Sequence, residues 1–107
     1  MDDVLRAIAE PNRRRILHLV WDAELSAGDI AATFEVSRPA ISQHLKVLEG
    51  AGLVAVRKAG TRRLYRARRQ AIADLMAFIE AYWDQGLGRL KDAAETEQRR
   101  RRHGGQA

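Results

Sequence analysis

The stretch SRPAISQHLKVLEGAGL, from Ser37 to Leu53, decides the fold. Ser37 is a favoured residue at a helix N-cap, and Pro39 suits the first turn, where a missing N–H costs nothing. Gly52 is typical of the left-handed residue that follows a helix end. The stretch therefore predicts a helix that is capped by Ser37 and ended by Gly52.

The side chains of this helix separate into two faces when they are placed 100° apart. One arc is expected to pack in the core, and it contains Ala40, Ile41, His44, Leu45, Val47 and Leu48. The other arc is polar, and it contains Arg38, Pro39, Ser42, Gln43, Lys46 and Glu49. Because His44 lies in the middle of the apolar arc, we favour a hydrogen-bonded core or boundary histidine over a DNA ligand.

The polar face has the chemistry of a helix that reads DNA. The helix N-terminus, with the Ser37 hydroxyl, can bind a phosphate. Arg38 and Gln43 can each make paired hydrogen bonds to a base edge, and the short Ser42 allows close approach to the groove. Lys46 lies one turn further on, where it can contact the DNA backbone. An ordinary solvated helix would more usually carry Glu–Lys pairs, so DNA readout is the favoured interpretation.

Two helices are predicted at the start of the chain. Residues 2–9 have apolar residues at helical spacing. Pro11 interrupts this pattern, and Asn12 is expected to cap a second helix over residues 13–22. The apolar stripe of the second helix is Ile16, Leu17, Val20 and Trp21.

A short third helix is expected between the second helix and Ser37. Ser26 and Asp29 have the spacing of a capping box, in which each residue bonds the backbone N–H of the other. The helix that follows is expected to be buried through Ile30 and Phe34. The second and third helices would then lead directly into the helix capped by Ser37.

After Gly52 the apolar residues alternate with polar ones, which predicts a two-stranded hairpin that turns at Ala59-Gly60-Thr61. From Gln70 the helical spacing returns and continues for more than 20 residues, with Gly86 and Gly88 as weak points. The fold class is mainly α with a small β-hairpin (α+β). Four helices, a hairpin and a long last helix make a winged helix-turn-helix. We expect one domain over residues 1–98 and a basic, disordered tail over residues 99–107.

Composition narrows the function classes further. The chain has 107 residues and no cysteine, which excludes disulfides and thiolate metal sites. It contains no apolar run of the roughly 18 residues that a membrane span needs. The N-terminus is unlike a signal peptide, so we expect no membrane partner and a cytoplasmic protein.

The net charge of +5 is concentrated in the hairpin, because residues 57–69 hold seven Lys or Arg and no acid. Residues 99–102 add four more arginines. A local patch of this kind indicates a phosphate-rich partner more strongly than a high isoelectric point does. The alternative is a solvated loop.

Catalytic and metal-binding constellations are missing from the sequence. His18 and His103 have no acidic or histidine neighbour at the spacing of metal ligands. There is no glycine-rich phosphate loop and no nucleophile beside a base, and Ser37 and Ser42 are better explained as a cap and a contact. We therefore expect no enzyme activity, no metal site and no cofactor.

Two segments, AIAEPNRRRILHLV over residues 7–20 and SRPAISQHLKVLEGAGLVAVRKAGTRRLYR over residues 37–66, carry a family resemblance. Together they resemble the ArsR family of winged-helix transcriptional repressors, and the likeness covers about residues 4–90. The resemblance implies a homodimer that binds an inverted repeat near a promoter. It also implies that the polar face of the helix enters the major groove, and that the wing touches the DNA backbone or the minor groove.

These lines of reasoning give two sets of site residues. The expected DNA contacts are Ser37, Arg38, Pro39, Ser42, Gln43, Lys46, Lys58, Thr61, Arg62 and Arg63. The resemblance places the dimer interface on the first and last helices, and the last helix has more apolar surface than a small core can cover. The expected interface residues are Leu5, Ile8, Leu75, Ile79, Tyr82, Trp83 and Leu90.

The chain departs from the metal-sensing members that it resembles. Those members carry a cysteine pair near the DNA-reading helices, or His and Asp ligands on the last helix. This chain has no cysteine, and residues 70–98 contain no histidine. Metal sensing is therefore not expected, and the inducer stays open. The predicted function is a sequence-specific repressor that binds DNA as a homodimer, and the alternative is a winged-helix module that binds an acidic protein.

Overall fold

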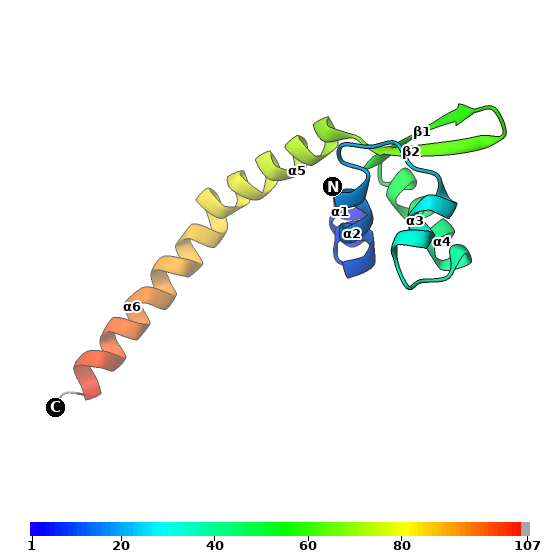
Figure 1. The fold of residues 1–107 in the computed structure, drawn as a ribbon. Coiled ribbons are helices and arrows are strands. Elements are labelled where there is room, and N and C mark those ends of the chain that lie inside the picture. Colours follow the sequence, from blue (N-terminus) through cyan, green and yellow to red (C-terminus); the bar gives the residue numbers. More distant parts are fainter. Residues whose placement is uncertain (106–107) are drawn as a thin grey trace. The chain divides into compact units, whose positions relative to one another are not determined.

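The computed structural model describes residues 1–105, and it gives only the backbone for Leu87 and residues 102–105. The chain divides into two compact units, one over Met1–Leu75 and one that starts at Met76. In order, the elements are α1 (Asp2–Ile8), α2 (Pro11–Leu19), α3 (Ala27–Thr33), α4 (Arg38–Gly50), β1 (Val54–Ala59), β2 (Arg62–Ala67), α5 (Arg69–Tyr82), the π-helical turn η1 (Trp83–Leu87) and α6 (Gly88–Gly105) (Figure 1). The predicted order of four helices, a hairpin and a long last helix is confirmed.

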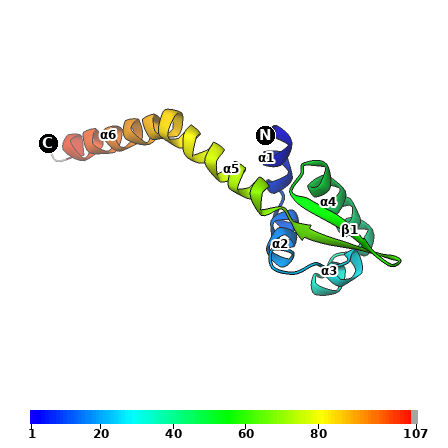
Figure 2. The ribbon, with the colours of Figure 1, turned by 90° about the horizontal axis from the view of Figure 1, so that it is seen from above.

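The first unit is built around the apolar face of α4. Ile41, Leu45 and Leu48 on this helix are at most 1% exposed. They share the core with residues from the other helices and the hairpin. The fully buried partners are Ala7, Ile16, Val20, Ile30 and Leu53. Figure 2 shows the hairpin running beside α4 and α3, which both contact it.

The ends of α4 have the predicted caps. The Ser37 hydroxyl accepts a hydrogen bond of 3.3 Å from the Ala40 N–H. At the other end Gly52 has a φ of 75°. Its N–H donates to the Glu49 carbonyl at 3.0 Å, and the Leu53 N–H donates to the Leu48 carbonyl at 2.9 Å. This is a Schellman motif, and it passes the chain directly from the buried end of α4 into β1.

One residue of the predicted apolar face of α4 is not in the core. Val47 is 42% exposed. Its place on the helix explains the error, because Val47 lies at the edge of the apolar arc, next to the polar face. The other members of that arc are buried or half-buried.

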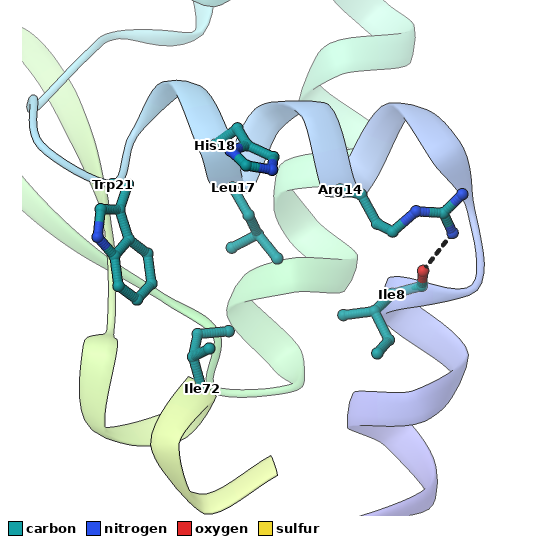
Figure 3. A pocket seen from close by; sticks show the side chains of 6 residues that line it. All are labelled: Ile8, Arg14, Leu17, His18, Trp21 and Ile72. Carbon is teal, nitrogen blue, oxygen red and sulfur yellow. Dashed lines mark hydrogen bonds between the residues drawn. The ribbon is translucent and has the colours of Figure 1, made fainter. Parts of the chain in front are cut away.

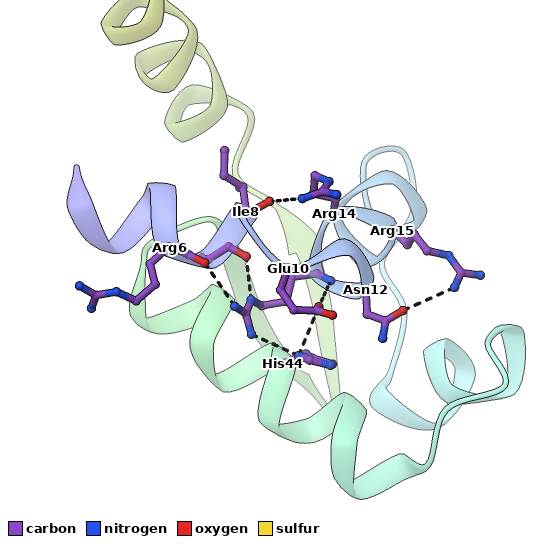
Figure 4. Close-up of polar contacts among 9 residues, drawn as sticks. Arg6, Ile8, Glu10, Asn12, Arg14, Arg15 and His44 are labelled. Carbon is purple, nitrogen blue, oxygen red and sulfur yellow. Dashed lines mark hydrogen bonds and ion pairs between the residues drawn. The ribbon is translucent and has the colours of Figure 1, made fainter.

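The predicted start of α2 is wrong by two residues. Glu10, not Asn12, is the N-cap, and its carboxylate accepts from the Arg13 N–H at 2.9 Å (Figure 4). Pro11 occupies the first turn, where its fixed φ favours the helix rather than interrupting it. The helix ends at Leu19, so Trp21 lies beyond it.

The predicted capping box of α3 is confirmed. The Ser26 hydroxyl accepts from the Asp29 N–H at 3.1 Å, and the Asp29 carboxylate accepts from the Ser26 N–H at 3.4 Å. Ile30 is fully buried, whereas Phe34 is only half-buried. The exposed side of the Phe34 ring faces the guanidinium of Arg15, 4.5 Å from the ring centroid.

The hairpin closes with a two-residue loop. β1 and β2 pair antiparallel from Val54↔Ala67 to Ala59↔Arg62, which leaves Gly60 and Thr61 as the loop. Gly60 has a φ of 63° and Thr61 does not have a positive φ, as in a type II′ turn. Leu25 exchanges two backbone hydrogen bonds with Tyr65, of 3.1 and 2.8 Å. The hairpin is thereby attached to the connection between α2 and α3.

The second unit is helical throughout its described residues. In η1 the Gly88 N–H reaches the Trp83 carbonyl, and a Cβ on Gly88 would lie 2.8 Å from that oxygen. The predicted weak point is therefore a π-turn that has no room for a side chain at Gly88. Among the described residues of this unit, the large apolar side chains that are exposed are Met76, Phe78, Ile79, Tyr82, Trp83 and Leu90.

The expected disordered tail differs from the structure, since α6 continues through residues 99–105. Glu97 stabilises this part of the helix by pairing with Arg100 at 3.6 Å and Arg101 at 3.8 Å, three and four residues on. Residues 106–107 lie outside the described residues. Within the described part of the chain, no helix combines the length and the apolar character of a membrane span.

A pair of glycine substitutions tests the turn between α4 and β1. Gly52→Ala should lower the free energy of unfolding by about 1–2 kcal/mol, because a Cβ is unfavourable in the left-handed conformation. Gly50→Ala, two residues earlier in α4 with no atom within 4 Å of the added Cβ, should raise it by about 0.5–1 kcal/mol. Urea unfolding of the two variants measures both values. Equal effects of the two substitutions would contradict this assignment.

Candidate nucleic-acid interface

A polar groove lies between α4 and the hairpin, and it brings together the two predicted DNA-contacting segments. From α4 it includes Arg38, Ser42 and Lys46, and from the hairpin it includes Thr61, Arg62 and Arg63. The remaining lining residues are Ser26, Ala27, Glu49 and Tyr65. A single hollow is thus lined by side chains that suit base edges and side chains that suit phosphates.

Four predicted contact residues lie outside the lining of this groove. Ser37, Pro39 and Gln43 are exposed on α4, and Lys58 is exposed on β1. Gln43 directly follows Ser42 on the polar side of the helix, so it remains accessible from the same side. The Ser37 hydroxyl is engaged as the cap of α4.

Arg38 extends toward the start of α3. A Cβ placed on Gly28 would lie 3.8 Å from the guanidinium carbon of Arg38 and 3.8 Å from the Ser26 hydroxyl. The guanidinium therefore lies close to the first turn of α3. The pattern of α4 alone did not predict this position, because it depends on how α3 packs against α4.

Sequence reasoning missed three ion pairs that connect the α2–α3 connection and the first turn of α3 to the basic run. In each pair an acid of residues 22–29 binds an arginine of residues 57–69. The pairs are Asp22–Arg69 at 2.7 Å, Glu24–Arg57 at 2.9 Å and Asp29–Arg62 at 2.7 Å. Three of the seven cations in the run are therefore partly neutralised within the chain.

Arg62 is the most constrained of the predicted wing contacts. Its guanidinium donates to the Asp29 carboxylate at 2.7 Å and to the Ser26 hydroxyl at 3.2 Å. These two residues also form the capping box of α3, so Arg62 ties the wing to that helix start. No ion pair involves Arg63 within residues 1–105, which leaves its charge more available to an external anion than the charge of Arg62.

The ion pairs shift the pKa values of their members. The hydrogen bonds from Arg57 lower the pKa of Glu24, and Glu24 in turn raises the pKa of Arg57. Hydrogen bonds from Ser26 lower the pKa of Asp29, and Arg62 lowers it further. At neutral pH both carboxyl groups are therefore ionised, and they hold the hairpin against the α2–α3 connection and the first turn of α3.

His44 takes the structural role that its place in the apolar arc predicts. Its side chain is 19% exposed, and its Nδ1 lies 3.4 Å from Nη1 of Arg13 and 3.8 Å from the Glu10 carboxylate (Figure 4). Arg13 also donates to the Ala7 carbonyl at 2.7 Å and to the Arg6 carbonyl at 3.3 Å. Arg13 thus joins α1, α2 and α4. The sequence did not predict this role, because Arg13 is one of three consecutive arginines that spacing alone does not distinguish.

The residues predicted for a dimer interface differ in exposure. Ile79, Tyr82, Trp83 and Leu90 are 40–66% exposed, and Leu5 is 36% exposed. Ile8 is half-buried, and Leu75 is only 5% exposed within a single chain. Phe78, which was not in the predicted set, stacks on Tyr82 with 6.3 Å between the ring centroids.

Among the side chains that the structure describes, those of residues 1–101 except Leu87, no three His, Asp or Glu side chains are arranged to hold a metal ion together.

Comparison with known proteins relates this geometry to transcriptional regulators. Residues 10–56 match the family of the bacterial regulatory protein ArsR. The chain is 41% identical over 86 residues to the HTH-type transcriptional regulator Rv2034 of Mycobacterium tuberculosis, a match that covers 80% of each chain. It is 33% identical over 86 residues to the transcriptional repressor SdpR of Bacillus subtilis, covering 80% of this chain and 96% of SdpR.

A solved structure extends the comparison to the fold. The structure is that of the homodimeric winged helix-turn-helix DNA-binding domain of Mb0332 from Mycobacterium bovis. It superimposes with a TM-score of 0.64 and 31% identity, over 80% of each chain. The predicted winged helix-turn-helix is therefore confirmed.

The lowered pKa values predict how stability depends on pH. Because Glu24 and Asp29 have pKa values below their ordinary 4.5 and 3.8 in the folded chain, the folded state binds fewer protons than the unfolded state there. Stability should therefore decrease as the pH falls through and below about 4.

Two variants test whether the ion pairs cause this loss of stability at low pH. Glu24→Gln and Asp29→Asn should each be less stable than the wild type at pH 7 and should lose less stability on acidification to pH 3. Glu35→Gln, a change of an exposed acid on the α3–α4 turn, is the matched control and should follow the wild type. Urea unfolding at the two pH values is the measurement, and an unchanged pH dependence in the first two variants would contradict the assignment.

Proposed function

The chain belongs to the ArsR family of bacterial winged helix-turn-helix transcriptional regulators, and we propose that it represses transcription by binding an inverted-repeat operator as a homodimer. The observation that carries the proposal is the groove in which Arg38, Ser42 and Lys46 of α4 face the arginines of the wing. Repression is the activity in the name of SdpR. With this function the protein is a cytoplasmic DNA-binding regulator rather than an enzyme.

α4 is the element that reads bases in this proposal. Its apolar side is fixed in the core, so its polar side is presented outward as one rigid surface. Arg38 and Gln43 have the donors and acceptors for paired hydrogen bonds to guanine and adenine edges. On binding DNA, the Arg38 guanidinium would leave its place near Gly28 to reach a base edge.

The wing contacts phosphates in this proposal, with a division of roles between its two arginines. Arg63 and Lys58 contact phosphate oxygens or the minor groove. Arg62 mainly positions the wing, since Asp29 and Ser26 already hold its guanidinium. Arg62 was expected to be a DNA contact like Arg63, and here its role is mainly to position the wing.

Dimerisation is the second part of the proposal. The exposed stripe of Met76, Ile79 and Trp83 follows the three- and four-residue spacing of a helix–helix interface. Burying a large apolar side chain contributes about 1.5–3 kcal/mol, so a second copy gains considerably by covering the stripe. The homodimeric state of Mb0332 supports the same assembly.

A gel shift with DNA from upstream of the gene is the direct test of the function. The protein–DNA complex is challenged with excess non-specific competitor DNA and, separately, with an acidic polypeptide. A complex that survives both supports a sequence-specific regulator. If the acidic polypeptide displaces the bound DNA as readily as unlabelled specific DNA does, the protein is instead a protein-interaction module.

If α4 reads bases, mutations on its polar face should reduce the affinity for DNA by an amount that depends on the DNA sequence. Arg38→Ala or Gln43→Ala should reduce discrimination among operator variants by about 1–3 kcal/mol at the affected base pair, if the contact is bidentate. Fluorescence anisotropy with matched and mismatched operators measures the difference. Arg15→Ala, on α2 and outside the groove, is the control. An equal loss of affinity for every sequence would show that α4 does not read bases.

The same titrations, repeated over a salt series, separate the two wing arginines. Arg63→Ala should weaken binding to all sequences and reduce the slope of log affinity against log salt by about 0.9, the value for one phosphate contact. Arg62→Ala should change the slope less than Arg63→Ala does.

Dimerisation predicts that a charge in the stripe separates the subunits. Ile79→Glu should give a monomer at a micromolar concentration at which the wild type is a dimer, because the new carboxylate would be buried without a partner. Ala81→Glu adds the same charge on the opposite side of α5 and should remain a dimer. Light scattering gives the masses, and dimeric Ile79→Glu would show that the stripe is not the interface.

A further inference from the structure

A second cavity, distinct from the DNA-facing groove, lies between α1, α2 and the start of α5. Its volume is about 380 Å³, and it is lined by Ile8, Arg14, Leu17, His18, Trp21 and Ile72 (Figure 3). The size falls within the range of about 300–1,000 Å³ that is typical of small-molecule sites. The side chains of Ile8, Leu17, Trp21 and Ile72 converge on the space from three helical segments and give it apolar walls.

The charged side chain that lines this cavity is Arg14. Arg14 donates one hydrogen bond, of 2.7 Å, to the Ile8 carbonyl, and this contact holds its guanidinium at the rim (Figure 3). A guanidinium carries five N–H donors, so donors remain for a bound anion. His18 supplies a second polar edge. Arg69, whose guanidinium lies 5.2 Å from the centroid of the Trp21 ring, is outside the lining and is paired with Asp22. None of the six lining side chains is an acid.

Apolar walls with a fixed cation at the rim select one class of ligand. A neutral hydrocarbon would leave the Arg14 charge without a partner, and a small inorganic anion would leave the apolar walls in contact with water. A molecule that carries both an apolar body and a carboxylate satisfies both parts.

We propose that this cavity binds a small amphipathic carboxylate, an aliphatic or aromatic acid whose apolar body lies among Leu17, Trp21 and Ile72 and whose carboxylate pairs with Arg14. The ligand would contact the last residues of α1, the length of α2 and the first turn of α5. The site goes beyond the proposed DNA-binding function, and its binding assay needs no DNA.

Isothermal titration calorimetry of the wild-type protein tests the proposal with two probes of equal chain length, octanoate and the uncharged octanamide. Octanoate should bind saturably and more tightly than octanamide. Arg14→Gln should weaken octanoate binding about tenfold, the effect of losing a charged hydrogen bond, and leave octanamide unchanged. Arg15→Gln, the neighbouring arginine outside this cavity, should bind octanoate as the wild type does.

A cavity-filling variant keeps the test decisive if Arg14→Gln disturbs the fold. Ile72→Phe adds apolar volume inside the cavity, so it should weaken the binding of both probes, and its circular dichroism should match the wild type. The proposal is overturned if octanoate does not bind, if the two probes bind equally, or if neither variant changes the affinity.

The competing occupant is a second copy of this chain, because Ile8 also belongs to the predicted dimer interface. Titrations at protein concentrations below and above dimer formation, with masses from light scattering, distinguish the two. Octanoate affinity that is the same in monomer and dimer supports the ligand site. Affinity that is lost as the dimer forms means that the partner fills the cavity, and this overturns the proposal.

Discussion

The burial of one face of α4 is the constraint on which the rest of the first unit depends. Ile41, Leu45 and Leu48 are almost completely removed from water, and each contributes on the order of 1.5–3 kcal/mol. Because these three side chains fix the rotation of the helix, the polar side chains opposite them must point outward. The Schellman motif then starts β1 directly from the buried end of α4. A single packing requirement therefore sets both the orientation of α4 and the origin of the wing.

Ion pairs add to the packing of the core in fixing the position of the wing. Acids of the α2–α3 connection and of the first turn of α3 bind arginines of the hairpin and of the first turn of α5, so the basic run serves two purposes. Part of it fixes the wing against the helices, and part remains for an external anion. Each pair is solvent-exposed, and exposed pairs contribute little to stability. Their main effect is to restrict where the wing can lie relative to α4.

The sequence predicted the features that depend on local patterns, and it failed where the answer depends on packing. Ser37, Gly52 and the Ser26–Asp29 box act through neighbours a few residues away, and all three are confirmed. The predicted start of α2 is wrong because Glu10 caps the helix, although Asn12 is the residue type more favoured at an N-cap. The pairing of Arg62 and the position of Arg38 could not be read from spacing, since their partners lie 33 and 10 residues away. The continuation of α6 past residue 98 differs from the disorder that a run of like charges predicts, because Glu97 pairs with Arg100 and Arg101 along the helix.

The π-turn at η1 changes the angular phase of the helix that follows it. In an uninterrupted α-helix Met76, Ile79, Trp83 and Leu90 would all lie within an arc of about 60°, since each residue advances by about 100°. The wider turn absorbs one extra residue, so Leu90 is rotated by about 100° away from the other three. The apolar seam on α5 thus stops at Trp83 instead of continuing along α6. Gly88 leaves no room for a Cβ beside the Trp83 carbonyl, and it follows the point at which the apolar stripe of α5 ends and the apolar side chain of α6 faces another direction.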